Sequence, residues 1–351
     1  MAGTPWLYNS LPNISSNNSF LGNSSLELDD DVMFNSFLVS GFLCIFVVGV
    51  FGNSIVILLT FRPTCSVSVN TINTYIVNVA FSDLLYIFGC LFYTLTNYNQ
   101  KGWMFGDIGC RLILGQDILT MHVSTFILTI MSVERYVAVV HPMISLRYRS
   151  VGFARRISAA VWFTGVVITL PMVIYMTEVH IGDRDKYSCT WTLEADRSLP
   201  NYMLAIFLIT FLIPSIITAS VYILLLFHFL NLVSPAHSAN RRIKRSKRKV
   251  AQIIFVIVFI FWVCYIPFWT YQLIILRDVN FDSNNIMGLV TLVLSYLNSC
   301  VNPFLYTLLP RRYNMWKRIC SSRSRRTYTP VHVQLGVVKR LGHAHNGHAV
   351  L

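Results

Sequence analysis

Residues 109–140 read GCRLILGQDILTMHVSTFILTIMSVERYVAVV, a run in which apolar side chains predominate. A helix that crosses a lipid bilayer needs about 20 mainly apolar residues. A helix of a soluble bundle would carry polar residues along its whole outward face, and this run does not. The stretch therefore predicts a membrane-spanning helix.

Six further apolar runs of similar length accompany it. The 351-residue chain is 54% hydrophobic and 12% charged, whereas soluble domains are roughly 45–50% apolar and about 25% charged. We therefore predict an all-α membrane protein, a seven-transmembrane-helix bundle over residues 34–309. The predicted spans are 34–61, 71–96, 109–140, 157–176, 202–230, 250–276 and 286–309.

Basic residues are concentrated on one side of this bundle. Seven lie between Arg241 and Lys249 and nine from Arg311 onward, whereas residues 1–33 have no Lys or Arg and four acids. Basic loops favour the cytoplasm, so we expect an extracellular N-terminus and a cytoplasmic C-terminus in the plasma membrane. The net charge of +13 then reflects topology and attraction to anionic membrane lipids, and no nucleic-acid binding is expected.

The two ends of the chain lie outside the predicted bundle. Residues 1–33 are expected to be a glycosylated extracellular tail, with sequons at Asn13, Asn17 and Asn23. Residues 310–320 space basic and apolar residues as an amphipathic helix on the membrane surface would. Its Cys320 is a palmitoylation candidate or else a free thiol. Residues 321–351 are expected to be a disordered cytoplasmic tail.

Two of the eight cysteines fall on the predicted outer side. Cys110 lies at the outer end of the span 109–140, and Cys189 lies in the long loop before the fifth span. Disulfides persist in that oxidising environment. A Cys110–Cys189 bond would hold the loop over the mouth of the bundle.

One polar stripe runs along the span 109–140. Its members step by four, three, four, three and four residues, which places them on one helix face. From the first to the last the helix rises about 27 Å, close to the ~30 Å of the hydrocarbon core. The stripe consists of Asp117, Met121, Ser124, Leu128, Met131 and Arg135.

An unpaired carboxylate is costly inside a bilayer, so Asp117 is a candidate functional residue. We interpret it as the counter-charge for a cationic ligand. The alternative is an internal pair with the Tyr296 hydroxyl. The two interpretations are compatible if Tyr296 pairs with Asp117 until a ligand arrives. Other side chains at a similar depth are expected to form the pocket wall or simply to pack. They are Met121, Phe268, Trp269, Gln272 and Tyr296. Trp191, two residues after Cys189 in the outer loop, is a candidate to cap the ligand.

A second buried carboxylate, Asp83, is expected to face oxygen-bearing side chains of other spans. Such oxygens suit a sodium ion, and the alternative is a water-filled hydrogen-bond network. No other metal and no cofactor is expected. The candidate sodium site consists of Asp83, Ser124, Asn298, Ser299 and Asn302.

Every predicted span carries one sequence landmark. In chain order they are Gly52-Asn53, Asp83, Glu134-Arg135-Tyr136, Trp162, Pro214 with Tyr222, Cys264-Tyr265-Ile266-Pro267 and Asn302-Pro303-Phe304-Leu305-Tyr306. The set resembles rhodopsin-like (class A) G-protein-coupled receptors over about residues 34–320. Each motif alone is weak, but seven in the right order are specific.

Within that family the chain is most similar to urotensin-II receptors, through residues 106–111 (GDIGCR), 117–122 (DILTMH) and 298–309. Residues 136–142 (YVAVVHP) also resemble somatostatin receptors. The resemblance implies a cyclic peptide ligand with an aromatic residue beside a lysine. It further implies coupling to Gq, phospholipase C and calcium, with arrestin as a further candidate partner. The alternative is a somatostatin-like or melanin-concentrating-hormone-like peptide receptor coupled to Gi.

The resemblance also implies a two-state switch. Arg135 would pair with Glu134 at rest, and helix kinks at Pro267 and Pro303 would let the cytoplasmic ends move. Two residues depart from the family pattern: Glu134 replaces the usual Asp, and Tyr265 replaces the usual Trp. The expected switch and coupling residues are Glu134, Arg135, Tyr136, Tyr222, Tyr265, Pro267, Pro303 and Tyr306.

Other functional classes fit the sequence poorly. A transporter or channel would be expected to show internal repeats or interrupted spans, and we find no repeat. A retinal pigment would need a lysine within 286–309, which has none. No nucleophile, base and acid occur together as an enzyme would require, so no catalytic residue is assigned.

Overall fold

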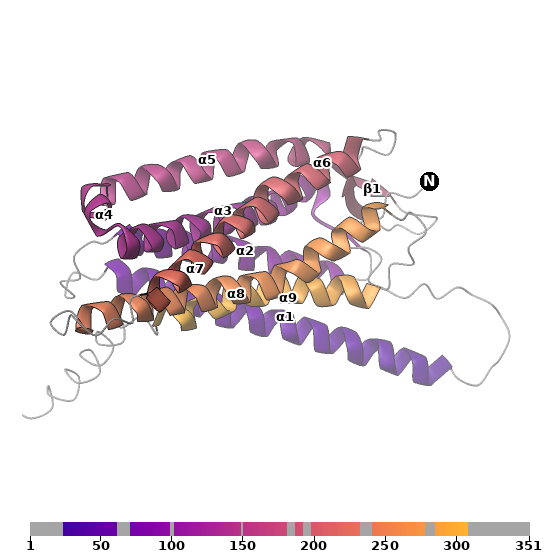
Figure 1. Cartoon of the computed structure of the whole chain (residues 1–351). Coiled ribbons are helices and arrows are strands. Elements are labelled where there is room, and N and C mark those ends of the chain that lie inside the picture. Colours follow the sequence, from indigo (N-terminus) through magenta and orange to yellow (C-terminus); the bar gives the residue numbers. More distant parts are fainter. Residues whose placement is uncertain are drawn as a thin grey trace, which may run out of the picture.

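The computed structural model describes residues 24–61, 71–98, 102–148, 150–180, 187–191, 198–231, 241–277 and 285–307. Long helices lie side by side along most of the molecule (Figure 1). The helical elements are α1 (Ser24–Phe61), α2 (Thr71–Tyr98), α3 (Gly106–Val140), α4 (Pro142–Tyr148), α5 (Val151–Tyr175), α6 (Ser198–Phe207), η1 (Leu208–Leu212), α7 (Ile213–Asn231), α8 (Arg241–Arg277) and α9 (Asn285–Thr307).

Seven helical segments in the described part of the chain are long and apolar enough to cross a membrane. This confirms the predicted seven-helix membrane fold. The segments are Val39–Phe61, Thr71–Thr96, Gly106–Val140, Val151–Tyr175, Asn201–His228, Ile254–Ile274 and Met287–Phe304. The fifth combines α6, the π-helical turn η1 and α7, which follow one another without a break.

Several helices extend beyond the spans predicted from hydrophobicity, and α1 and α8 extend furthest. Helix α1 begins at Ser24, so it includes residues 27–31 of the segment that we assigned to the tail, and α8 begins at Arg241, within the basic cluster. Hydrophobicity reports only the part of a helix that lipid can surround. A helix continues into water because its backbone hydrogen bonds are internal.

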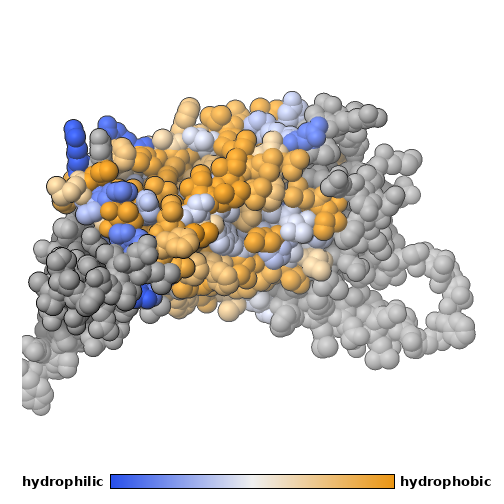
Figure 2. All heavy atoms as spheres, in the orientation of Figure 1, coloured by the Kyte–Doolittle hydropathy of each residue, from blue (hydrophilic) through white to orange (hydrophobic). Residues whose placement is uncertain are grey.

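The outer surface of the bundle is apolar. Large side chains point away from the core, with Phe51 at 69%, Phe163 at 71% and Phe304 at 60% exposure. Figure 2 shows hydrophobic side chains over most of the visible middle of the bundle, with hydrophilic ones mainly toward its ends. Such a surface is suited to lipid and would promote aggregation in water.

Helix α3 occupies the centre of the bundle. It packs against α2, α5, α7 and α8, and Figure 1 shows it running between its neighbours. All members of the predicted polar stripe are buried: Asp117, Met121, Ser124, Leu128, Met131 and Arg135. The inward direction of the stripe is therefore as predicted.

Candidate functional site

Asp117 lies on the inner face of α3 with 7% of its surface exposed. The Tyr296 hydroxyl of α9 donates a hydrogen bond to Asp117 Oδ2 at 3.0 Å. Asp117 Oδ1 is buried and makes no hydrogen bond of good geometry among the described residues, and the Tyr93 hydroxyl is within hydrogen-bonding reach of the carboxylate. Since a buried carboxylate oxygen without a partner is costly, Oδ1 is a ready acceptor for an incoming donor.

Three tyrosines from α2 and α9 surround this carboxylate, and we call them the tyrosine cluster: Tyr86, Tyr93 and Tyr296. The Tyr296 ring stacks on Tyr86 with centroids 4.4 Å apart, and the Tyr93 ring lies edge-on to Tyr296 at 6.0 Å. The Tyr86 hydroxyl shares a hydrogen bond of 2.6 Å with Ser295 Oγ. Neither Tyr86 nor Tyr93 was predicted from the sequence as a site residue. Their seven-residue spacing places them on one face of α2, a signal that was available.

Most residues of the expected pocket wall lie inside the bundle. Met121, Trp269 and Gln272 are buried, and Phe268 is half-buried. Trp269 of α8 packs against Phe207, with ring centroids 5.5 Å apart. Trp269 therefore joins α8 to the fifth span, which is a packing role. Trp191 ends strand β2, and its side chain lies outside the described residues.

A β-hairpin covers the same end of the bundle, which we call the hairpin end. Strands β1 (Met176–His180) and β2 (Tyr187–Trp191) pair antiparallel, with Glu178 opposite Cys189. Cys189 forms a disulfide with Cys110 of α3, across a Cα–Cα distance of 5.5 Å. The predicted disulfide is thus confirmed, whereas the hairpin itself was not foreseen.

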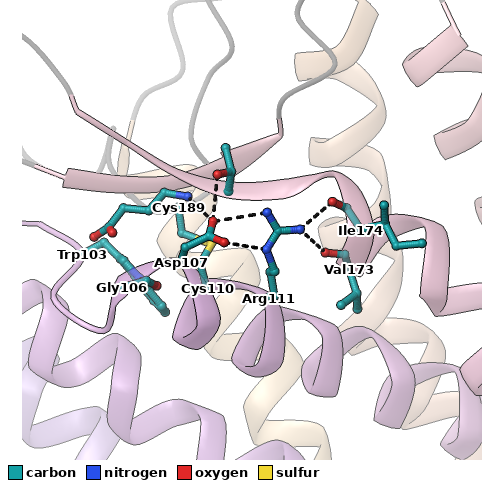
Figure 3. A network of polar contacts seen from close by, with 10 residues as sticks. Trp103, Gly106, Asp107, Cys110, Arg111, Val173, Ile174 and Cys189 are labelled. Atoms are coloured by element: carbon teal, nitrogen blue, oxygen red, sulfur yellow. Dashed lines mark hydrogen bonds and ion pairs between the residues drawn. A yellow bond between two sulfur atoms is a disulfide. The ribbon is translucent and has the colours of Figure 1, made fainter.

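Arg111 makes a second link between α3 and this end (Figure 3). Its Nε donates to Asp107 Oδ2 at 2.7 Å, and its Nη1 donates to the carbonyls of Val173 and Ile174 at 3.2 and 2.6 Å. Carbonyls in the last turn of a helix lack partners within the helix. Arg111 therefore caps the end of α5.

Asp107 extends this network into the hairpin. Its Oδ1 accepts hydrogen bonds from Thr177 Oγ1 at 2.8 Å and from the Glu178 backbone N–H at 3.1 Å. Asp107 also lies in the first turn of α3, where a negative charge is favourable. One carboxylate thus joins α3, Arg111 and β1.

We expect Arg111→Ala to lower the unfolding free energy by about 1–2 kcal/mol, because charged hydrogen bonds and carbonyl caps are lost from a partly exposed site. Arg111→Lys should recover only part of the lost unfolding free energy, since a lysine ammonium cannot form all the hydrogen bonds of the planar Arg guanidinium. Thermal unfolding of the purified protein measures both variants. Full recovery by lysine would contradict the bridging role.

Two of the four residues expected beside Asp83 in the candidate sodium site contact it. Asn302 Nδ2 donates to Asp83 Oδ2 at 2.9 Å, and Ser299 is also within hydrogen-bonding reach of this carboxylate. Ser124 instead donates to Ser82 Oγ at 3.1 Å. Asn298 Oδ1 is buried without a hydrogen-bond partner among the described residues. The oxygen donors present therefore fit a hard monovalent cation.

The opposite end of α3 holds the expected coupling residues. Glu134 accepts a hydrogen bond from Thr71 of α2, and Arg135 is buried at 9% exposure. The Tyr136 ring lies edge-on to His141 at 6.0 Å. This end therefore joins α2 and α3 through a carboxylate–hydroxyl contact that the sequence did not indicate.

The expected switch residues of the other helices lie in helix interiors. Pro267 lies within α8 and Pro303 within α9. Tyr265 is buried, with its ring 4.6 Å from that of Phe261. Tyr222 packs on Phe255 at 5.3 Å. The side chain of Tyr306 lies outside the described residues, as do the sequons at Asn13, Asn17 and Asn23, Cys320, the helix expected at 310–320 and the tail 321–351.

The chain is similar in sequence to known proteins with seven membrane-spanning helices. The family described as 7 transmembrane receptor (rhodopsin family) matches residues 52–306. The human urotensin-2 receptor is 32% identical over 305 residues, covering 86% of this chain and 76% of the relative. The bovine urotensin-2 receptor is 32% identical, covering 92% and 83%. The human somatostatin receptor type 3 is 33% identical, covering 81% and 68%. The chain belongs to the rhodopsin family of seven-transmembrane G-protein-coupled receptors, as a relative of urotensin-2 and somatostatin receptors.

Proposed function

We propose that this receptor binds a cyclic urotensin-II-like peptide at its hairpin end and activates Gq, phospholipase C and calcium release. One observation carries the proposal: Oδ1 of the buried Asp117 carboxylate makes no hydrogen bond of good geometry among the described residues. A cationic side chain is the natural partner for such a group. Similarity to urotensin-2 receptors supports a peptide as its source.

The ligand group that we assign to Asp117 is a lysine beside an aromatic residue. Its ammonium would reach Oδ1, while Oδ2 accepts the hydrogen bond of the Tyr296 hydroxyl. In a low-dielectric site this charged contact is stronger than in water. Met121, Trp269 and Gln272, which are buried, would supply apolar and amide contacts to the aromatic residue.

We place the hairpin end outside the cell and the Arg135 end in the cytoplasm. The disulfide at the hairpin end suits an oxidising compartment. At the other end α8 begins with a dense run of basic residues, as cytoplasmic segments do. The ligand would then enter from outside, and a G protein would bind at Arg135.

Binding is converted into signalling by a shift between two arrangements of the helices. Prolines inside α8 and α9 each remove a backbone hydrogen bond, so these helices can bend there. A peptide with higher affinity for the arrangement open at the Arg135 end increases its population. By linkage, a bound G protein then raises the peptide affinity.

The proposal is tested in cells that express the chain with an N-terminal epitope tag. Urotensin, somatostatin and melanin-concentrating-hormone peptides are applied, and calcium and cyclic AMP are both recorded. We expect the urotensin peptide to raise calcium. Equal surface levels of the tag in all wells serve as the control for expression. Lowered cyclic AMP without calcium would overturn the Gq assignment.

A Gi-coupled somatostatin-like receptor is the second candidate. It rests on the 33% identity to the human somatostatin receptor type 3 and on the same requirement for a cationic ligand group. Preference for the somatostatin peptide in the same panel would select it. Nucleotide exchange on purified Gq and Gi, compared with ion flux in the same vesicles, also separates a receptor from a channel.

We propose a sodium site that modulates this receptor and is formed by Asp83, Ser299 and Asn302. The support is their mutual proximity and the oxygen of Asn298 that has no partner among the described residues. A bound sodium ion would supply positive charge to this cluster. Asn302 and Ser299 already contact the Asp83 carboxylate.

A further inference from the structure

Gly89 of α2 lies directly against the Asp117 carboxylate. The glycine is buried. A Cβ at this position would lie 3.0 Å from Asp117 Cγ and 3.1 Å from Oδ2, and it would overlap Oδ1. Any side chain larger than hydrogen would therefore collide with the carboxylate where it now rests.

Other glycines within the bundle face a different environment. A Cβ at Gly115 would meet Val173, and a Cβ at Gly165 would meet Leu119 and Val123. These are contacts between helices through apolar side chains. At Gly89 all three nearest atoms belong to one carboxylate. Since glycine destabilises a helix interior relative to alanine, its presence here is explained by the space that the carboxylate needs.

We infer that Gly89 is a positioning residue: it lets the Asp117 carboxylate lie back against α2 and so sets the length of the cationic side chain that the site accepts. This inference rests on the proposed function. The tyrosine cluster holds the carboxylate in the same place, because Tyr296 donates to Oδ2 from the side of α9. A cation must then extend across the bundle to reach Oδ1.

The geometry gives the expected direction of change. Restoring normal contact of about 3.5 Å between an alanine Cβ and the carboxylate requires the latter to move roughly 1 Å away from α2. This displacement is close to the length that one methylene group adds to a side chain. That added length is somewhat less than a C–C bond of about 1.5 Å. Gly89→Ala should therefore shift the preference toward a shorter cationic side chain.

The first experiment needs no ligand. Thermal unfolding is measured for purified wild type, Gly89→Ala, Asp117→Ala and the double variant. Gly89→Ala alone should lower Tm by several degrees, but it should leave Tm unchanged or raise it when Asp117 is alanine, because the colliding group is then absent. Gly41→Ala is the matched control, since a Cβ there meets no atom within 4 Å. Equal shifts in both backgrounds would overturn the positioning role.

The second experiment measures the length preference. Cyclic peptides carrying ornithine, lysine or homolysine at the cationic position are compared for potency on wild type and Gly89→Ala at matched surface expression. One methylene in a fitted pocket changes affinity by about 10–200-fold, so we expect the ornithine-to-lysine potency ratio to rise by about tenfold in the variant. An unchanged ratio would overturn the inference. A wild type indifferent to all three peptides would contradict the proposed function, and the stability experiment would still decide whether Gly89 positions the carboxylate.

Discussion

Replacing Asp117 with asparagine is expected to lower peptide potency by at least about 30-fold, or to abolish the calcium response, with normal surface expression. Asparagine keeps the size of the side chain and can still accept the Tyr296 hydrogen bond of 3.0 Å. It removes only the negative charge. Losing one partner of a buried charged pair costs about 2–5 kcal/mol, much of it from the ligand ammonium left unpaired.

Two comparisons make this result specific. Tyr296→Phe removes the hydroxyl but keeps the carboxylate, so its potency should change far less than that of Asp117→Asn. A peptide with norleucine in place of lysine should lose potency on wild type and lose little more on Asp117→Asn, as expected for a coupled pair. Additive losses, or an unchanged potency of Asp117→Asn, would remove Asp117 from the ligand site.

Breaking the disulfide is expected to have the second largest effect. The double variant Cys110→Ala and Cys189→Ala should unfold at a markedly lower temperature and bind peptide at least about tenfold more weakly. The bond closes a loop with a sequence separation of 79 residues, for which loop-closure entropy corresponds to about 4 kcal/mol. It also fixes β2 over the end of α3 where the ligand would enter.

The Asp107–Arg111 network limits the damage in that variant, because it holds β1 and the end of α5 independently of the disulfide. Adding Arg111→Ala should therefore reduce binding more than it does in the presence of the disulfide. Cys44→Ala is the control, since Cys44 is an exposed free cysteine. Equal peptide binding with and without the disulfide would show that the hairpin does not shape the site.

Local patterns were sufficient to predict the bundle and part of its chemistry. A span of apolar residues has few structural alternatives in lipid, because every backbone group must be hydrogen-bonded within the segment. Helical spacing then indicated that Asp117 and Arg135 face inward on one stripe, and both are buried. The pair Asp117–Tyr296 was also anticipated. These inferences depend on residues of one helix or on the strong penalty for a lone buried charge.

Contacts between helices were much harder to anticipate. The Ser124 hydroxyl bonds to Ser82 instead of Asp83, and Trp269 packs against Phe207. Helix faces are known from sequence, but the rotation and depth of one helix relative to another depend on the packing of all their side chains. A shift of a few ångströms decides which of two neighbouring polar groups is within hydrogen-bonding distance.

The residues alone indicate seven membrane-spanning helices, one carboxylate deep on the third, and the landmarks of the family. They suffice because hydrophobic length and helical periodicity are local properties. The place where that carboxylate rests is set by the folded bundle. Gly89, the tyrosine cluster and Asp117 come from three helices, and their meeting depends on close packing that no single stretch of residues specifies.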